Sequence, residues 1–121
     1  MSQVKKSQVK IYHNPRCSKS RQTLVLIQEQ GIEPEIINYL ETPPSIDELT
    51  TVLSLLKLEP QALMRKRENE YKESGLDNLC LNESEQIKLM AQFPKVIERP
   101  IVLANGKAAI GRPPENVLKI L

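Results

Sequence analysis

The chain has 121 residues, 40% of them hydrophobic and 26% charged, a composition typical of a single compact globular domain and not of a disordered or fibrous protein. The formal net charge is only +2, so overall charge gives no reason to expect a nucleic acid or an anionic membrane as a partner. No stretch approaches the roughly 20 apolar residues of a membrane span, and the lysine-containing N-terminus lacks the apolar segment of a signal peptide, so we expect a cytoplasmic protein.

A strand, a helix and a second strand are predicted near the start of the chain. Apolar and polar side chains alternate over residues 8–13, which predicts a strand. A helix is predicted over residues 20–30, with Gly31 as its C-cap, and a second strand over residues 35–39. Because a helical crossover joins the two strands, we expect them to pair in parallel.

The middle of the chain is predicted to be a helical insertion. Ser45 and Glu48 are spaced as a capping box, and apolar residues follow them at helical spacing. Short helical pieces are expected after this helix. One of them, over residues 82–92, should begin with a second capping box formed by Asn82 and Glu85.

The last part of the chain is predicted to be a hairpin followed by a helix. Residues 100–104 have the composition of a strand, and Asn105 with Gly106 forms a strong two-residue turn signal before the next strand. A helix is expected within residues 112–121. The element order predicts an α/β fold, a thioredoxin-like mixed β-sheet flanked by helices with a helical insertion, in a single domain over residues 1–121.

Cys17 lies in the loop between the first predicted strand and the first predicted helix. N–H groups at a helix start carry partial positive charge, and this charge and cationic neighbours favour the nucleophilic thiolate form of cysteine. The basic neighbours are His13, Arg16, Lys19 and Arg21. The hydroxyl of Ser20 is near enough in sequence to bond a thiolate or a bound oxyanion. This pattern predicts a reactive cysteine, whereas a buried and inert one would have apolar surroundings.

The chain offers no obvious partner thiol and no metal site. Ser20 stands where a C-x-x-C pair would have its second cysteine, so an adduct on Cys17 would need a reductant from outside. Cys80 has apolar neighbours on both sides, and we expect it to be a small core residue. For His13 two interpretations stay open, a hydrogen-bonded structural residue or a group that supports the thiolate. One histidine and two distant cysteines cannot assemble a zinc site.

Three further arginines lie at predicted element boundaries. Arg65 follows an apolar run, Arg99 precedes the strand that starts at Pro100, and Arg112 lies between the last strand and the last helix. Guanidinium groups donate two parallel hydrogen bonds, which suits a tetrahedral oxyanion. The alternative is three solvated charges. Their common position at element boundaries favours a site beside the Cys17 loop.

Four segments carry a resemblance over nearly the whole chain: "VKIYHNPRCSKSRQTL", "ALMRKRENEYKESGL", "ERPIVL" and "GRPPENVLKIL". They resemble the glutathione- and glutaredoxin-dependent arsenate reductase (ArsC) family, which has a thioredoxin-like fold. The C-S-K-S-R loop is similar to that of its chromosomal branch. The resemblance implies that Cys17 is the nucleophile and that Arg65, Arg99 and Arg112 bind the oxyanion.

The resemblance also implies supporting residues and a reaction. His13 and Ser20 match residues that support the thiolate, and Pro100 matches the cis-proline of thioredoxin-like folds. Arsenate is expected to bind the arginines and form a thioarsenate adduct on Cys17, which glutathione and glutaredoxin resolve to arsenite. The expected partners are arsenate or a similar oxyanion, glutathione as co-substrate and glutaredoxin. No bound cofactor and no metal are expected, and the protein should be a monomer. Lys19 stands where plasmid-type enzymes have a different residue and adds charge near the thiol.

Three other functions fit parts of the pattern. Spx-like regulators share the fold, bind RNA polymerase and sense disulfide stress, but those with a C-x-x-C sensor need a cysteine where this chain has Ser20. Phosphatase-like enzymes place an arginine six residues after the cysteine, where this chain has Thr23. A glutathione-dependent thiol oxidoreductase with another substrate is the third, and the three arginines argue against it.

Overall fold

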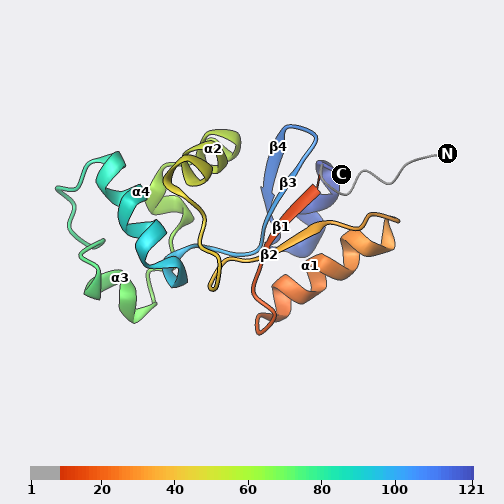
Figure 1. Cartoon of the computed structure of the whole chain (residues 1–121), viewed down its shortest axis with the longest axis horizontal. Coiled ribbons are helices and arrows are strands. Elements are labelled where there is room, and N and C mark those ends of the chain that lie inside the picture. The colour runs from red at the N-terminus through yellow and green to blue at the C-terminus, as the bar shows by residue number, and fades with distance from the viewer. Residues whose placement is uncertain (1–8) are drawn as a thin grey trace. The chain divides into compact units, whose positions relative to one another are not determined.

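The computed structural model describes residues 9–121 (Figure 1). Residue Gln8, the first of the predicted opening strand, lies outside the described residues, as does most of the N-terminal segment considered above as a signal peptide. Within the described part, the chain divides into two compact units. Unit 1 consists of residues 9–39 and 99–121, and unit 2 consists of residues 40–98. That the whole chain forms a single domain stays a prediction.

Unit 1 contains a four-stranded mixed sheet, as predicted. The strands are β1 (Val9–His13), β2 (Glu35–Asn38), β3 (Ile101–Ala104) and β4 (Lys107–Ile110). Their order in the sheet is β2-β1-β3-β4 (Figure 1). The β1–β2 pair is parallel, as we expected from the helix that connects the two strands. The β1–β3 and β3–β4 pairs are antiparallel.

Two helices pack side by side on one face of this sheet, α1 (Ser18–Glu29) and η4 (Pro114–Lys119). Alternate residues of β1 and β3 face them, because side chains of a strand alternate between its two faces. The shared core is aliphatic and consists of Val9, Ile11, Ile27, Val102, Ala104, Val117 and Ile120. The predicted terminal helix is thus present, but as a 3-10 helix of six residues, a form common in short pieces.

The first helix begins two residues earlier than predicted, at Ser18 instead of residue 20. Cys17 is its N-cap, because the Cys17 carbonyl already accepts the first helical hydrogen bond, from Arg21 N at 3.0 Å. The C-cap is Gln30 and not Gly31, which follows it with a left-handed φ of 78°. The earlier start matters for chemistry, since it places the thiol at the positive end of the helix.

The predicted hairpin joins β3 and β4. Asn105 and Gly106 both have positive φ, 54° and 72°, as a type I′ turn requires. The Asn105 side-chain amide donates to the carbonyl of Ile120 at 2.7 Å, which ties the turn to the end of the chain. This bond joins the hairpin to the segment that covers the sheet.

Unit 2 is the predicted helical insertion and contains α2 (Ile46–Leu56), α3 (Asn69–Glu73) and α4 (Glu83–Gln92). Two short 3-10 helices, η2 (Pro60–Leu63) and η3 (Pro94–Val96), complete it. Both predicted capping boxes are present, Ser45 with Glu48 on α2 and Asn82 with Glu85 on α4. Among the helices within residues 9–121, none is long and apolar enough to cross a membrane.

Candidate active site

Cys17 is held at the start of α1 by the chain that leads into the helix. The backbone N–H of Cys17 donates to the carbonyl of Asn14 at 3.0 Å, which closes the turn before the helix. The residue is only 8% exposed. Its sulfur interacts with the backbone N–H groups of Ser20 and Lys19, in the first helical turn. No acidic side chain occupies this turn, so nothing there offsets the positive end of the helix.

The surroundings of Cys17 lower the pKa of its thiol below the ordinary value. Burial is the largest single effect and acts in the opposite direction, because it disfavours the charged thiolate. The backbone N–H of Ser20 and the positive charge of Arg99 lower the pKa, and the N–H of Lys19 and the charge of Arg112 add to them. These stabilising effects outweigh the burial, so the site favours the nucleophilic form of the cysteine.

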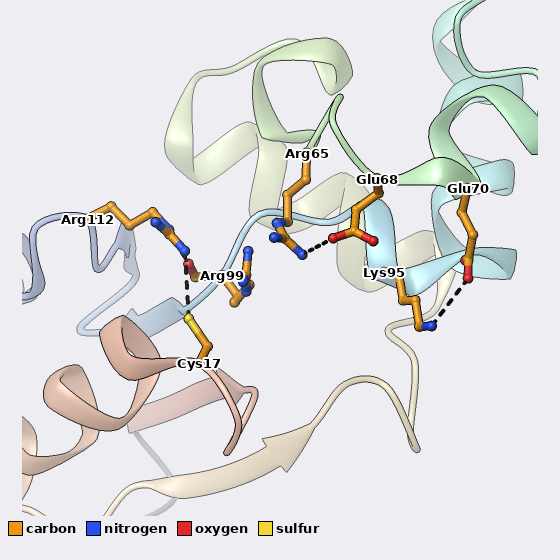
Figure 2. Close-up of polar contacts among 7 residues, drawn as sticks. All are labelled: Cys17, Arg65, Glu68, Glu70, Lys95, Arg99 and Arg112. Carbon is orange, nitrogen blue, oxygen red and sulfur yellow. Dashed lines mark hydrogen bonds and ion pairs between the residues drawn. The ribbon is translucent and has the colours of Figure 1, made fainter.

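Two of the three predicted arginines lie at the Cys17 loop. The Nη2 atom of Arg112 donates to the Cys17 sulfur at 3.7 Å, and the Nε atom of Arg112 donates to the carbonyl oxygen of Arg99 at 2.8 Å (Figure 2). Arg99 precedes β3 and Arg112 follows β4, so the antiparallel pairing of these strands brings the two residues to one end of the sheet. The Arg99–Pro100 peptide bond is cis, as predicted, and so is the bond from Arg112 to Pro113, which the sequence did not predict.

The third predicted arginine, Arg65, belongs to unit 2. It is half-buried there and forms an ion pair with Glu68 at 2.7 Å (Figure 2). Its backbone N–H donates to the carbonyl of Val96. Glu68 is a partner that the sequence reasoning did not identify. The predicted role of Arg65 in binding an oxyanion with the other two arginines stays a prediction.

His13 and Ser20 form a buried pair beside the cysteine. A hydrogen bond of 2.6 Å joins His13 Nδ1 to Ser20 Oγ, and the backbone N–H of Asn14 donates to the same oxygen at 3.0 Å. Burial lowers the pKa of His13, and the charge of Arg21 lowers it further. The lowered pKa favours the neutral imidazole at pH 7, and the hydrogen bond to Ser20 joins His13 to the first turn of α1. That His13 supports the thiolate stays a prediction.

Cys80 is exposed, and the prediction that it is a core residue is wrong. It lies in the loop between α3 and α4, where its backbone N–H donates to the Asn78 side chain at 2.9 Å. The neighbouring Leu79, which suggested burial, is itself 89% exposed. Apolar neighbours in sequence therefore did not indicate packing here, because the chain turns at Leu79 and Cys80 and leaves both side chains exposed, while Leu81 is half-buried.

Chemically, the described part of the site combines a thiolate, a helix start and guanidinium donors. A helix start and arginine side chains together bind tetrahedral oxyanions, because N–H groups and positive charge both face the anion. Within residues 9–121, no group of three histidine, cysteine, aspartate or glutamate residues is placed to hold a metal ion. The arrangement suits nucleophilic attack by Cys17 on an anion that the arginines hold.

Comparisons with known proteins find similarity over nearly the whole chain. The sequence model of the ArsC family matches residues 12–120. "Uncharacterized protein YfgD" of Escherichia coli K12 is 55% identical over 115 residues, which are 94% of this chain and 97% of that protein. An "Arsenate reductase" of Neisseria meningitidis is 49% identical over 115 residues, 94% of this chain and 98% of its own length.

A solved structure is similar over the same length. The structure described as "Arsenate reductase from Vibrio cholerae" has a TM-score of 0.89 and 54% sequence identity, and covers 93% of this chain and 97% of that one. The match therefore includes the sheet and helices of unit 1 as well as the helical insertion that forms unit 2.

Proposed function

The chain belongs to the ArsC family, and on that basis we propose that it is an arsenate reductase with Cys17 as its nucleophile. The observation that carries the proposal is the contact of 3.7 Å between Arg112 Nη2 and the Cys17 sulfur at the start of α1. A cation beside a thiolate both stabilises the nucleophile and attracts an anionic substrate. The name of the relative from Neisseria meningitidis supports arsenate as that substrate.

In the first step, arsenate binds to Arg65, Arg99 and Arg112. Their positive charge offsets the repulsion between two anions, the thiolate and the substrate. The Cys17 sulfur attacks arsenic, a sulfur–arsenic bond forms, and one arsenate oxygen leaves as water after protonation. The product is a thioarsenate adduct that still contains As(V).

In the second step, external thiols supply the two electrons. Glutathione attacks arsenic and a second oxygen leaves as water. A glutaredoxin thiolate then attacks the glutathione sulfur and forms a mixed disulfide. The bond between arsenic and the glutathione sulfur breaks, and the electron pair of that bond stays on arsenic, which is thereby reduced from As(V) to As(III). Water hydrolyses the remaining bond, which releases arsenite and restores the Cys17 thiol. Ser20, in the position of a resolving cysteine, supports the need for external thiols.

His13 and Ser20 support this chemistry by fixing the first turn of α1. Their mutual hydrogen bond, together with the bond from Asn14 N, holds Ser20 in place, and the backbone N–H of Ser20 in turn stabilises the thiolate. Both are positioning residues in this proposal. The cytoplasmic location and the monomeric state stay predictions from the sequence.

The test is NADPH consumption in the presence of arsenate, glutathione, glutaredoxin and glutathione reductase. We expect arsenate-dependent turnover by the native protein and by Cys80→Ser, and none by Cys17→Ser. Cys80→Ser is the matched control because it removes the other thiol of the chain, which is exposed. Equal inactivity of all three proteins would contradict the arsenate assignment. Turnover of a mixed disulfide of glutathione instead would identify a thiol oxidoreductase.

A further inference from the structure

Thr23 is a fully buried polar residue of α1 that has no part in the reaction above. Its hydroxyl donates to the carbonyl of Lys19 at 2.8 Å, one turn earlier in the helix. The same oxygen lies 3.5 Å from the carbonyl oxygen of Gly111, although 88 residues separate the two in sequence. The side chain therefore sits between the helix that carries Cys17 and the segment that follows β4.

Gly111 leaves no room for any side chain at this contact. A Cβ atom on Gly111 would overlap Thr23 Oγ1 and would lie 3.0 Å from Thr23 Cγ2 and 2.8 Å from Pro100 Cγ. These separations are shorter than ordinary van der Waals contacts between carbon atoms. The absence of a side chain at residue 111 is thus what allows the helix and the strand end to approach so closely.

The residues on both sides of this contact are linked to groups of the candidate site. On the helix side, the carbonyl oxygen of Lys19 accepts the hydrogen bond from the Thr23 hydroxyl. The backbone N–H of Lys19 is one of the groups that stabilise the Cys17 thiolate. On the strand side, the backbone N–H of Gly111 donates to the carbonyl of Pro100 at 2.9 Å. The next residue is Arg112, whose guanidinium contacts the sulfur. The contact between Thr23 and Gly111 therefore lies behind the pair formed by Cys17 and Arg112.

We propose that Thr23 and Gly111 are a positioning pair that sets the distance between the Cys17 thiolate and the Arg112 guanidinium. The Thr23 side chain acts as a spacer of fixed size against the bare backbone of Gly111. Any increase in that spacing moves the strand end, and Arg112 with it, away from the start of the helix. The inference deepens the proposed function and rests on Cys17 being its nucleophile.

The test measures the rate of alkylation of Cys17 by iodoacetamide as a function of pH. All proteins carry Cys80→Ser, because the exposed Cys80 would also react. The charged groups that face the Cys17 sulfur are Arg99 and Arg112, and both are retained in the first comparison. Gly111→Ala should shift the profile to higher pH and, below its midpoint, slow alkylation by roughly 3- to 10-fold, because a smaller fraction of the thiol is ionised.

The same substitution in an Arg112→Gln background tests whether Gly111→Ala acts through the position of Arg112 or through a general disturbance of the structure around Cys17. If Gly111 acts by placing Arg112, then Gly111→Ala should cause no further shift once the guanidinium is gone. An equal shift in both backgrounds would overturn the proposal. Circular dichroism and thermal unfolding of each variant verify that the fold is retained.

Variants of Thr23 keep the test decisive if Gly111→Ala does not fold. Thr23→Val puts a methyl group in place of the hydroxyl, and a methyl cannot approach the carbonyl oxygens of Lys19 and Gly111 as closely. The spacing should therefore increase and the profile should shift in the same direction, whereas Thr23→Ser keeps the hydroxyl and should shift it less. Thr50→Val is the matched control, because Thr50 on α2 makes the same hydroxyl bond of 2.8 Å to the carbonyl one turn earlier, on an exposed face of unit 2. An unchanged profile in folded Thr23→Val would contradict the proposal.

The readout needs no arsenate, so its outcome is independent of the substrate assignment. A shifted profile in a protein without arsenate turnover would support the positioning pair and contradict the proposed function. Where turnover is present, Gly111→Ala should raise KM for arsenate more than it lowers kcat, since Arg112 acts on binding of the anion as well as on the thiolate.

Discussion

The Nη2 atom of Arg112 lies 3.7 Å from the Sγ atom of Cys17, although 95 residues separate them in the sequence. The thiol comes from the start of the first helix, and the guanidinium from the segment that follows the last strand. The antiparallel pairing of β1 with β3, and of β3 with β4, carries this segment back to the helix. The site is thus assembled from the two ends of the described chain.

Removal of the Arg112 guanidinium should destabilise the Cys17 thiolate and lower the affinity for the anionic substrate. Loss of one preorganised donor to a developing negative charge typically costs about 100-fold in rate, so we expect Arg112→Gln to lower kcat/KM for arsenate by roughly that factor. Arg112→Lys should recover only part of the loss, because an ammonium cannot donate two parallel hydrogen bonds. Steady-state kinetics checks this, and full activity of Arg112→Gln would contradict the assigned role.

The lowered pKa of Cys17 predicts a distinctive pH profile. In the Cys80→Ser background, the alkylation rate of Cys17 should rise with pH and level off below about 8.5, the ordinary thiol value. Arg99→Gln should move the profile to higher pH, because the charge of Arg99 helps to lower the pKa. Arg16→Gln is the control, since Arg16 is exposed beside Cys17 in the chain and should have little effect. A native profile that still rises steeply at about pH 9 would be inconsistent with a stabilised thiolate.

His13 should make stability depend on pH in a predictable direction. Its pKa is lowered in the folded state, so the unfolded chain binds more protons between that lowered value and about 6.5. Stability should therefore fall as the pH drops below about 6.5, and His13→Gln should lose this component. Urea unfolding of both proteins at acidic and neutral pH measures the difference. At neutral pH the variant should also be about 1–3 kcal/mol less stable, because it disturbs a buried hydrogen bond.

The positive charge of Lys19 should speed the reaction of anionic thiols, such as glutathione, with a mixed disulfide on Cys17. Its side chain is exposed in the first turn of α1, two residues after Cys17 in the chain, and no acidic residue in that turn offsets it. We expect Lys19→Gln to slow the reaction of glutathione with a mixed disulfide on Cys17 by roughly 2- to 5-fold at low salt, an effect that screening should largely remove at about 1 M salt. The neutral 2-mercaptoethanol is the control. An equal effect on both thiols would show that Lys19 does not act through its charge on the incoming thiol.

Local patterns in the sequence predicted most of the elements. Alternation over the first strand, the capping boxes at Ser45 and Asn82 and the turn at Asn105 each depend on sterics and hydrogen bonds within a few residues. Each therefore appears in the structure at the expected place. The same local reasoning was wrong for Cys80, because burial depends on what the rest of the chain places against a residue, and the Cys80 side chain is left exposed.

By itself, the sequence determined most of the elements, the mixed α/β fold and the loop that holds Cys17. Only the tertiary structure decided that Arg112 reaches the Cys17 sulfur and that Thr23 meets the bare backbone of Gly111. The physical reason is the separation in sequence between the residues that interact. Helix caps and turns form between neighbours in the chain, whereas the distance from a thiolate to a distant guanidinium depends on how closely a helix packs against the end of a strand.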